Sequence, residues 1–366
     1  MNIFIGLDVH SKFSVFVAQN NDGADLGTDR VATTPEGLAH MLHGLDAPAG
    51  TAIALESGPS ATWVSRQLTV LGMKPVVIDA HEVRAKACRP NQKSDLRDAR
   101  ELCEGLRRGL YQSLIYIPDE TIEILRLLIS RRRHFVGIST RQINAAKHLL
   151  RLRGQGGLVR ALSSEKAWQS LLANPQVQDR RSMLTLHADL WRQAQIARRQ
   201  LEGEILQAAR PFQSIIDLLC TMAGVGTLVA VTFIATLGDP HRFADSGRVV
   251  SYAGLAVSTY NSGERQIHGH ITKAGSGELR TMLCEAAQHA WRPTHPLNPY
   301  YRRLAARHGY QQAIIAVAQR LARILWRMWS NKEPFKLEKL NVEKVEHQQT
   351  RLIHYQLRDR PLIASH

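Results

Sequence analysis

The sequence predicts a mixed fold, in which one N-terminal α/β domain is followed by mainly helical (all-α) domains. Three observations lead to this prediction. Short apolar or alternating segments, separated by turn residues, fill residues 1–80. Apolar residues then recur with helical spacing and few breakers from about residue 118 to residue 208, and further helical segments follow, separated by glycines and polar loops. We therefore expect domains at residues 1–115, 116–210 and 211–335, with a charged tail at 336–366.

The first domain is expected to begin with three strands, at residues 2–9, 13–19 and 25–33, the last two joined by a turn at residues 21–24. A helix at 35–45 that Thr34 would cap, a strand at 51–56, a helix at 60–71 and a strand at 74–80 follow. Three meandering strands and then alternating helices and strands are the order of a ribonuclease-H-like (RuvC-like) domain. In such a sheet the first and fourth strands lie side by side.

Four acidic residues are predicted to meet at one edge of this sheet. Asp8 ends the first strand and Glu56 ends the fourth. Asp95 and Asp98 follow the expected helix N-cap Ser94, and their spacing places both carboxylates on one face of a helix. The helix dipole alone also favours acids in a first turn, so this pair by itself is not diagnostic. The four acids together predict a site for Mg²⁺ or Mn²⁺ that acts on phosphodiesters.

Two long helices are expected in the second domain, at residues 121–153 and 177–209, with a loop at about 158–175 between them. They would form an antiparallel coiled-coil arm. Basic residues on this arm could contact nucleic-acid phosphates: Arg131, Arg132, Arg133, Lys147 and Arg151. A solvated face used only for dimerisation is the alternative, and the two roles can coexist.

The third domain contains the one segment long enough to be considered as a membrane span. Residues 218–238 carry no charged side chain, but Gly224 and Gly226 interrupt them and acids flank both ends. We expect two short buried helices there instead. Residues 258–263 are expected to form a polar loop and residues 265–271 a strand, after which Ser276 would cap a helix at 278–291. A final amphipathic helix is expected at 311–329.

Charge and cysteine content indicate the kind of partner and compartment. The chain has 47 Lys and Arg against 32 Asp and Glu, a net charge of +15, which favours a nucleic-acid partner. A basic enzyme without such a partner is the alternative. No Cys-x-x-Cys pair occurs among the four cysteines, which argues for a reducing compartment. The N-terminus lacks the pattern of a signal peptide, so we expect a cytoplasmic protein that does not enter the membrane.

Several short motifs occur in a fixed order along the chain: Gly6 to Lys12, Glu56-Ser57-Gly58, Lys93 to Arg100, Ala223 to Gly226, Tyr252 to Leu255, Ser262-Gly263 and Gly269 to Gly275. Their order and spacing resemble those of the DEDD transposases of insertion sequences, the IS110 family, which includes the IS1111 subgroup and the Piv-type pilin-gene invertases. The resemblance implies a prokaryotic mobile-element recombinase with a RuvC-like domain, a coiled-coil arm and a C-terminal transposase domain.

The resemblance also implies roles for residues and partners. Asp8, Glu56, Asp95 and Asp98 would be the acidic quartet that holds the metal, and Ser262 would be the nucleophile of the C-terminal domain. An element-encoded bridge RNA would pair with both donor and target DNA. The enzyme would act as a homodimer or homotetramer, associated with the nucleoid when it acts.

The chemistry can be argued separately. Cations at an acid cluster can hydrolyse a strand, whereas an enzyme that rejoins strands gains from a covalent protein–DNA ester that keeps the free energy of the bond. Ser262 could form that ester, and Arg265 and Lys273 could neutralise charge on the scissile phosphate. Three alternatives remain: a RuvC-like metal-dependent junction nuclease, a nucleic-acid-binding protein without activity, and an ATP-binding domain of the sugar-kinase type. No second glycine-rich phosphate loop follows Glu56, which argues against the last.

Overall fold

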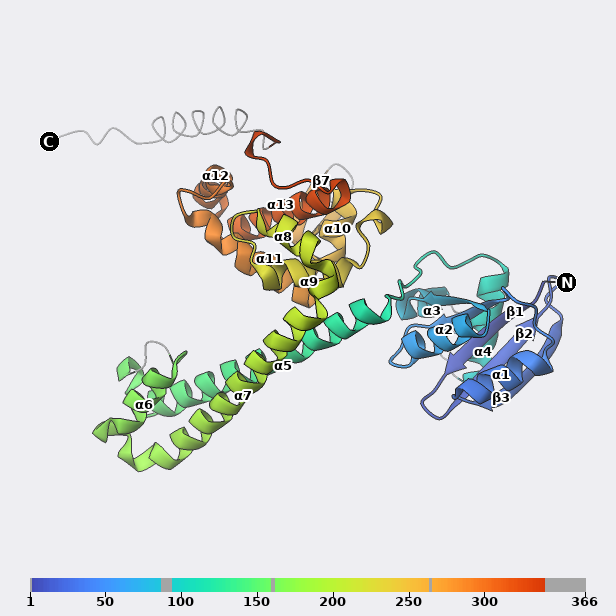
Figure 1. Cartoon of the computed structure of the whole chain (residues 1–366), viewed down its shortest axis with the longest axis horizontal. Helices are drawn as coiled ribbons and strands as arrows, with labels where there is room; N and C mark the ends of the chain where they lie inside the picture. The colour runs from blue at the N-terminus through green and yellow to red at the C-terminus, as the bar shows by residue number, and fades with distance from the viewer. Residues whose placement is uncertain (1, 87–93, 159–161, 263–264, 340–366) are drawn as a thin grey trace. The chain divides into compact units, whose positions relative to one another are not determined.

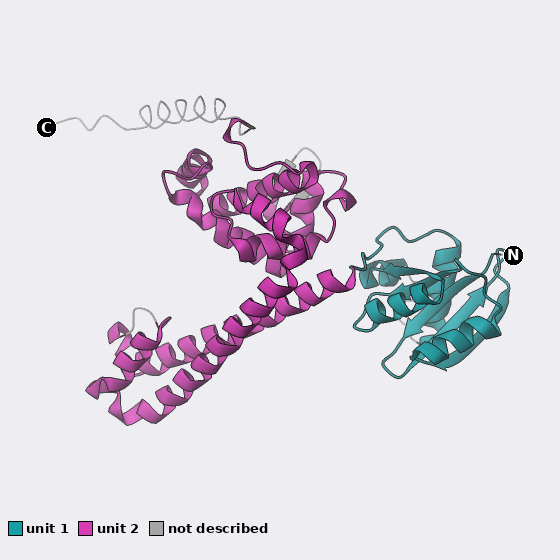
Figure 2. Cartoon of the chain, in the orientation of Figure 1, with its two compact units in different colours: residues 1–118 teal, residues 119–366 magenta. Residues whose placement is uncertain are grey.

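The computed structural model describes residues 2–86, 94–158, 162–262 and 265–339. The chain divides into two compact units, Met1–Pro118 and Asp119–His366 (Figure 2). The first unit contains a β-sheet with helices, and the second is mainly helical (Figure 1). The mixed α/β and helical composition expected from the sequence is thus confirmed.

The first unit is built on a five-stranded sheet of β1 Phe4–Val9, β2 Phe13–Gln19, β3 Asp25–Ala32, β4 Ala52–Glu56 and β5 Lys74–Ile78. Its strand order is β3-β2-β1-β4-β5. Strand β1 runs antiparallel to β2 and parallel to β4, and β4 runs parallel to β5. The first and fourth strands are therefore neighbours, as predicted, and the sheet is compatible with a ribonuclease-H-like domain.

Helices cover both faces of this sheet: α1 Pro35–Gly44, α2 Ala61–Val70, α3 Ala80–Lys86 and α4 Asp95–Arg107. Because side chains alternate along a strand, Ile5 and Leu7 face one side and pack with α1 and α2. Val15 and Val17 face the other side and pack against α4. The Thr34 hydroxyl accepts a hydrogen bond of 3.1 Å from a backbone N–H in the first turn of α1, which confirms the predicted cap.

In the second unit, the long helices α5 Glu120–Arg151 and α7 Arg181–Ala208 lie side by side (Figure 1). Ser139 on α5 accepts a hydrogen bond of 3.2 Å from the Gln195 side chain on α7. Further along α5, the Gln142 side-chain oxygen lies 2.8 Å from Nδ1 of His187, which comes earlier on α7. The two helices are therefore antiparallel.

The connection between these two helices corrects one expectation. Residues 158–175 were expected to form a loop, but they include the helix α6 Glu165–Ala173. The Ser164 hydroxyl caps its first turn, and the side chains of Trp168 and Leu171 are buried against the long helices. Two buried apolar side chains in nine residues are too few to give a recognisable helical pattern of apolar residues in the sequence.

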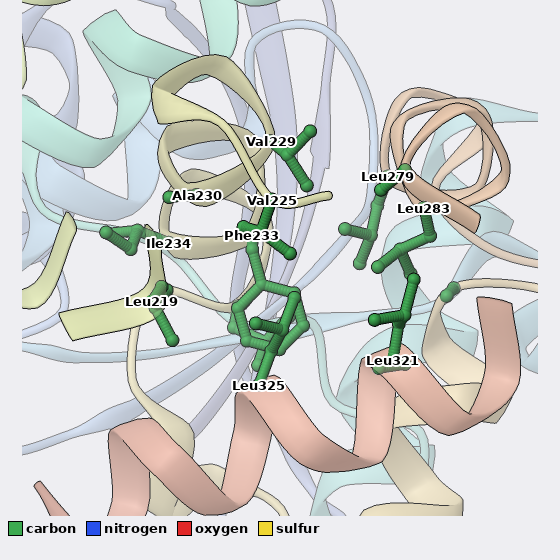
Figure 3. Packing of buried hydrophobic residues seen from close by; sticks show 14 of the residues in the cluster. Leu219, Val225, Val229, Ala230, Phe233, Ile234, Leu279, Leu283, Leu321 and Leu325 are labelled. Carbon is green, nitrogen blue, oxygen red and sulfur yellow. The ribbon is translucent and has the colours of Figure 1, made fainter. Parts of the chain in front are cut away.

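The remaining helices pack around one core: α8 Gln213–Cys220, α9 Thr227–Leu237, α10 Ser246–Tyr252, α11 Gly277–Gln288, α12 Asn298–His308 and α13 Tyr310–Asn331. Figure 3 shows Phe233 of α9 directed towards Leu325 of α13, with Leu321 and Leu283 beside them. Ile122 of α5 and residues at the end of α7 belong to the same core. The base of the arm and the C-terminal helices therefore form one packed body.

The glycine-interrupted segment forms two helices, as expected. Helix α8 ends at Cys220 and α9 begins at Thr227, with Gly224 between them at a φ of +82°. This left-handed conformation favours glycine. Among the described residues, no helix combines the length and apolarity that a membrane crossing requires.

A two-stranded hairpin, β6 Val257–Ser262 with β7 Arg265–Ile271, precedes α11. The expected strand at residues 265–271 is confirmed. Of the residues expected to form a loop, 258–263, residues 258–262 belong to β6, so the expectation was wrong there, and residue 263 lies outside the described residues. Polar side chains do not prevent a strand when a neighbouring strand satisfies its backbone, as β7 does here. Ser276 accepts a hydrogen bond from the backbone N–H of Leu279 and caps α11, as predicted.

Candidate active site

The paired strands β1 and β4 bring Asp8 and Glu56 to the same edge of the sheet. Their parallel pairing runs from Phe4 opposite Ala52 to Leu7 opposite Leu55, and Asp8 and Glu56 are the next residue on each strand. Because side chains at the same level of parallel neighbours point to the same face, both carboxylates project on the side that α4 covers. The sequence predicted this proximity from strand order alone.

Helix α4 adds the other two acids. The Ser94 hydroxyl accepts a hydrogen bond of 3.3 Å from the backbone N–H of Arg97, which confirms the predicted cap, and Asp95 and Asp98 lie in the first turn. The helix crosses β1 at Gly6, where a Cβ atom would stand 2.1 Å from a backbone oxygen of α4. Only glycine allows this approach, which brings the first turn of α4 close to Asp8.

Asp8, His10 and Asp95 form a compact group. Asp8 Oδ2 lies 3.1 Å from His10 Nε2, and His10 Nε2 lies 3.4 Å from Asp95 Oδ1. The three ligand atoms that these residues offer all lie within 4.8 Å of one another. One oxygen-binding cation could contact all three residues.

The electrostatics of Asp8 suit a cation. Burial raises the pKa of Asp8, His10 lowers it, and the nearby carboxylates of Asp98 and Asp95 raise it. Asp8 Oδ2 and His10 Nε2 are both buried, and neither has a well-aligned hydrogen-bond partner among the described residues. Buried polar atoms left in this way are costly unless something else contacts them. A divalent cation fits this donor set. It would contact the two buried atoms and would reduce the repulsion among the carboxylates.

His10 was not among the site residues proposed from the sequence. It follows Asp8 by two residues, and side chains two apart on an extended chain point to the same face. This spacing is the signal that could have found it. Its ring also packs 4.9 Å from the Phe13 ring, which restricts the orientation of the imidazole.

Glu56 lies at the margin of this group. Its carboxylate is about one-third exposed, and Oε1 lies 4.0 Å from a guanidinium nitrogen of Arg84. Asp98 is close enough to influence the pKa of Asp8. The structure thus brings Asp8, His10 and Asp95 into ligand distance, with Asp98 adjacent and Glu56 at the same sheet edge.

The predicted nucleophile belongs to the second unit. Ser262 ends β6, where its backbone pairs with that of Arg265, and the side chains of both lie outside the described part of the structure. Lys273 is exposed, and its backbone has a φ of +55°. Its N–H donates to the Gly254 oxygen at 3.1 Å, and its carbonyl accepts from the Arg280 guanidinium at 3.3 Å. These bonds hold the strained residue in place.

The basic residues proposed on the arm differ in their surroundings. Arg132 pairs with Glu202 of α7 at 2.8 Å, and Arg133 pairs with Glu278 of α11 at 3.1 Å. These two arginines therefore neutralise acids of the chain itself. Arg131 and Arg151 are exposed, and Lys147 is half-buried.

Comparison with known proteins identifies the family. A DEDD transposase profile of the IS110 type matches residues 5–153, which include all four acids. A second profile, described as transposase IS116/IS110/IS902 family, matches residues 216–302, which include the β6–β7 hairpin. The chain belongs to the IS110/IS116/IS902 family of transposases. It is therefore a DNA strand-transfer enzyme, and the family implies a divalent metal.

Relatives of this transposase agree with the assignment. It is 26% identical to a probable family 20 transposase of Pseudomonas aeruginosa over 290 residues, which span 76% of this chain and 83% of the relative. It is 24% identical to the transposase for insertion sequence element IS1111A of Coxiella burnetii over 297 residues, 78% of this chain and 79% of the relative. A segment of 135 residues is 33% identical to an IS110 protein of Streptomyces coelicolor, covering 36% of this chain and 32% of that protein.

Proposed function

We propose that this transposase cuts and rejoins DNA through a covalent ester between DNA and Ser262, with a divalent cation, Mg²⁺ or Mn²⁺, held by Asp8, Glu56, Asp95 and Asp98. The observation that carries this proposal is the convergence of β1, β4 and the first turn of α4 on one sheet edge. Mutually repelling carboxylates gathered around the buried oxygen Asp8 Oδ2 are the arrangement that a cation stabilises.

Each acidic residue has a defined part in this proposal. Asp8 and Asp95 would hold the cation through their carboxylate oxygens, and His10 offers a nitrogen close to both. Asp98 and Glu56 complete the negative environment and can bind through oxygen or water. When bound at this edge, divalent cations neutralise charge on the scissile phosphate and lower the pKa of an attacking hydroxyl.

The proposed strand transfer conserves the free energy of the phosphodiester bond that is broken. Ser262 Oγ bonds to phosphorus while one deoxyribose oxygen leaves, the serine proton passes to a base, and the leaving oxygen takes up a proton. A hydroxyl of the second DNA then attacks phosphorus and gives its proton to a base, the bond between phosphorus and Ser262 Oγ breaks, and Ser262 Oγ takes up a proton. Arg265, which pairs with Ser262 at the tip of the β6–β7 hairpin, and Lys273, which follows the other end of β7, are proposed to neutralise the phosphate.

The partners follow from the family resemblance and the basic charge. We propose donor and target DNA as substrates, and a noncoding bridge RNA that pairs with both. Residues 1–115 would supply the metal-binding domain, 116–210 the arm and 211–335 the serine domain, followed by the tail at 336–366. Arg131, Arg132, Arg133, Lys147 and Arg151 remain proposed nucleic-acid contacts. A homodimer or homotetramer, cytoplasmic and associated with the nucleoid when acting, would carry out the reaction.

The test separates this enzyme from a metal-dependent junction nuclease that only hydrolyses. Labelled plasmid carrying the DNA that flanks this gene is incubated with Mg²⁺, the protein and RNA transcribed from the flanking noncoding DNA. Denaturing electrophoresis then detects DNA covalently attached to protein. We expect an adduct with the natural chain, none with Ser262→Ala, and none without the RNA.

Ser258→Ala is the matched control, because Ser258 lies on the same strand and its hydroxyl donates to the His270 carbonyl oxygen at 2.9 Å. This variant should keep the adduct. Nicking by Ser262→Ala at the rate of the natural chain, with no adduct in either protein, would favour the hydrolytic nuclease. An adduct that forms equally well without RNA would remove the bridge-RNA part of the proposal and keep the serine part.

A further inference from the structure

A groove follows the outer face of α13, far along the chain from the residues discussed above. Two hollows of about 310 Å³ each line this face, and both are bordered by Ile324 and Arg327. One hollow also contains Tyr300, Arg320 and Arg323, and the other contains Phe335 and Lys336. We call these two hollows with the helix face between them the α13 groove.

Three arginines form a stripe along this groove. Arg320, Arg323 and Arg327 are three and four residues apart, so they share one helix face and span about 10 Å along the axis. Leu321 and Leu325 point from the other side of α13 into the core (Figure 3). The arginine stripe is therefore directed away from the core, and Arg323 and Arg327 are exposed.

The stripe lacks the acidic partners that arginines have elsewhere in this unit. Arg132 pairs with Glu202, and Arg192 pairs with Glu165. Within the described part of the chain, no carboxylate lies within ion-pair distance of Arg320, Arg323 or Arg327. Like charges at these spacings destabilise a helix. An anion bound along this face would remove that repulsion.

Among the described residues that line the two hollows, the one carboxylate is that of Glu333, and it pairs with a lysine and not with the stripe. Glu333 borders the hollow that contains Phe335, and its carboxylate lies 3.9 Å from the Lys336 ammonium. At the other end, the Arg320 guanidinium lies 4.8 Å from the centre of the Tyr300 ring. The groove therefore keeps the charge of its three arginines and presents an aromatic ring in each hollow.

We propose that the α13 groove binds a single-stranded polynucleotide, with the arginine stripe on successive phosphates and bases in the two hollows. Basic grooves with aromatic side chains bind single strands because phosphates and base faces can be contacted together. The bases of a duplex are stacked within it and cannot enter hollows beside a phosphate-binding stripe. The proposal does not depend on the cation site or on Ser262. RNA and single-stranded DNA share this chemistry, and the test distinguishes them.

The test measures binding of the full-length protein to labelled oligonucleotides of about 20 nucleotides by fluorescence anisotropy at several salt concentrations. The same sequence is used as RNA, as single-stranded DNA and as duplex DNA. The variant carries Arg320→Gln, Arg323→Gln and Arg327→Gln together. Loss of three single-strand phosphate contacts should reduce the steepness of the plot of log affinity against log salt concentration by about 2. This change corresponds to an affinity about 50-fold weaker at about 0.15 M salt.

The matched control carries Arg108→Gln, Arg199→Gln and Arg307→Gln, three exposed arginines at the C-cap of α4, on α7 and on α12, with the same change in net charge. We expect this control to lose less than about threefold in affinity. An equal loss in both triple variants, or a loss confined to duplex DNA, would overturn the proposal. A loss for RNA alone or for single-stranded DNA alone would support it and name the ligand.

A third variant covers the case in which the glutamine triple does not fold. Replacing the same three arginines with lysine keeps the charge on the groove, and a salt slope within about 0.5 of the natural value is then expected. A lysine triple that is folded by circular dichroism and has lost the full slope would contradict phosphate binding by the stripe.

Discussion

Gly6→Ala tests whether the approach of α4 to β1 builds the candidate metal site. A Cβ at residue 6 would lie 2.1 Å from the Ala99 carbonyl oxygen and 2.4 Å from the Cys103 backbone nitrogen. Ordinary van der Waals contact needs about 3.4 Å, so α4 has to move away from β1 by about 1 Å. Both obstructing atoms belong to helix backbone, which cannot rotate aside as a side chain can.

The shift has two expected consequences of known size. Overpacking of this kind costs about 1–3 kcal/mol in the free energy of unfolding, measured by urea titration. Because Asp95 moves with α4 and Asp8 does not, the ligand spacing changes by a similar distance. A misplacement of about 1 Å in an active site lowers activity about 100-fold, and the rate of plasmid nicking with Mg²⁺ measures it.

Gly44→Ala is the matched control for Gly6→Ala. Gly44 is exposed at the end of α1, and a Cβ there would meet no atom within 4 Å. Stability within about 0.5 kcal/mol of the natural chain and unchanged nicking are expected for this variant. If Gly6→Ala behaves like Gly44→Ala in both measurements, close packing of α4 on β1 does not position the acids, and the account of the site is wrong.

Two further predictions concern the Asp8 carboxylate and the Arg132–Glu202 ion pair. Because burial and the carboxylates of Asp98 and Asp95 raise the pKa of Asp8 in the folded state, the metal-free protein loses stability as the pH rises from the unfolded pKa through the folded one. Asp8→Asn should therefore raise the melting temperature of metal-free protein at pH 7, and added Mn²⁺ should stabilise the natural chain but not this variant. A lower melting temperature for metal-free Asp8→Asn would contradict the electrostatic argument. The Arg132–Glu202 pair joins α5 to α7 at 2.8 Å and is partly exposed, so a double-mutant cycle with alanine should give a coupling of about 0.5–1 kcal/mol, measured by thermal unfolding. A coupling of zero would show that other contacts hold the two arm helices together.

The first unit could be predicted well from the sequence because its signals are local. Alternating apolar residues define β1 and β2, and hydroxyl residues mark the starts of α1 and α4, where Thr34 and Ser94 do accept the capping hydrogen bonds. Strand order then placed Asp8 beside Glu56. These features depend on neighbours in the sequence or on general rules of topology, so no tertiary information was needed.

The errors occur where tertiary contacts determine the structure. Strand β6 has polar residues and exists because β7 satisfies its backbone, and α6 is held by only two buried side chains. No helix was predicted where α12 lies, although Pro299 stands in its first turn, a position that suits proline. Ion pairing of Arg133 with Glu278 joins residues far apart in the chain, and no sequence pattern reveals it. The spacing of His10 from Asp8 is local, but its approach to Asp95 depends on the same kind of long-range contact.

The most direct test of the metal centre is a crystal of the protein soaked in Mn²⁺ and measured at the manganese absorption edge. We expect an anomalous peak about 2.1 Å from carboxylate oxygens of Asp8 and Asp95, with Asp98 and Glu56 in the same coordination sphere or one water away. The peak should disappear in Asp8→Asn crystals. Manganese bound elsewhere, with these four side chains fully solvated and separate, would contradict the central claim that they form one cation site.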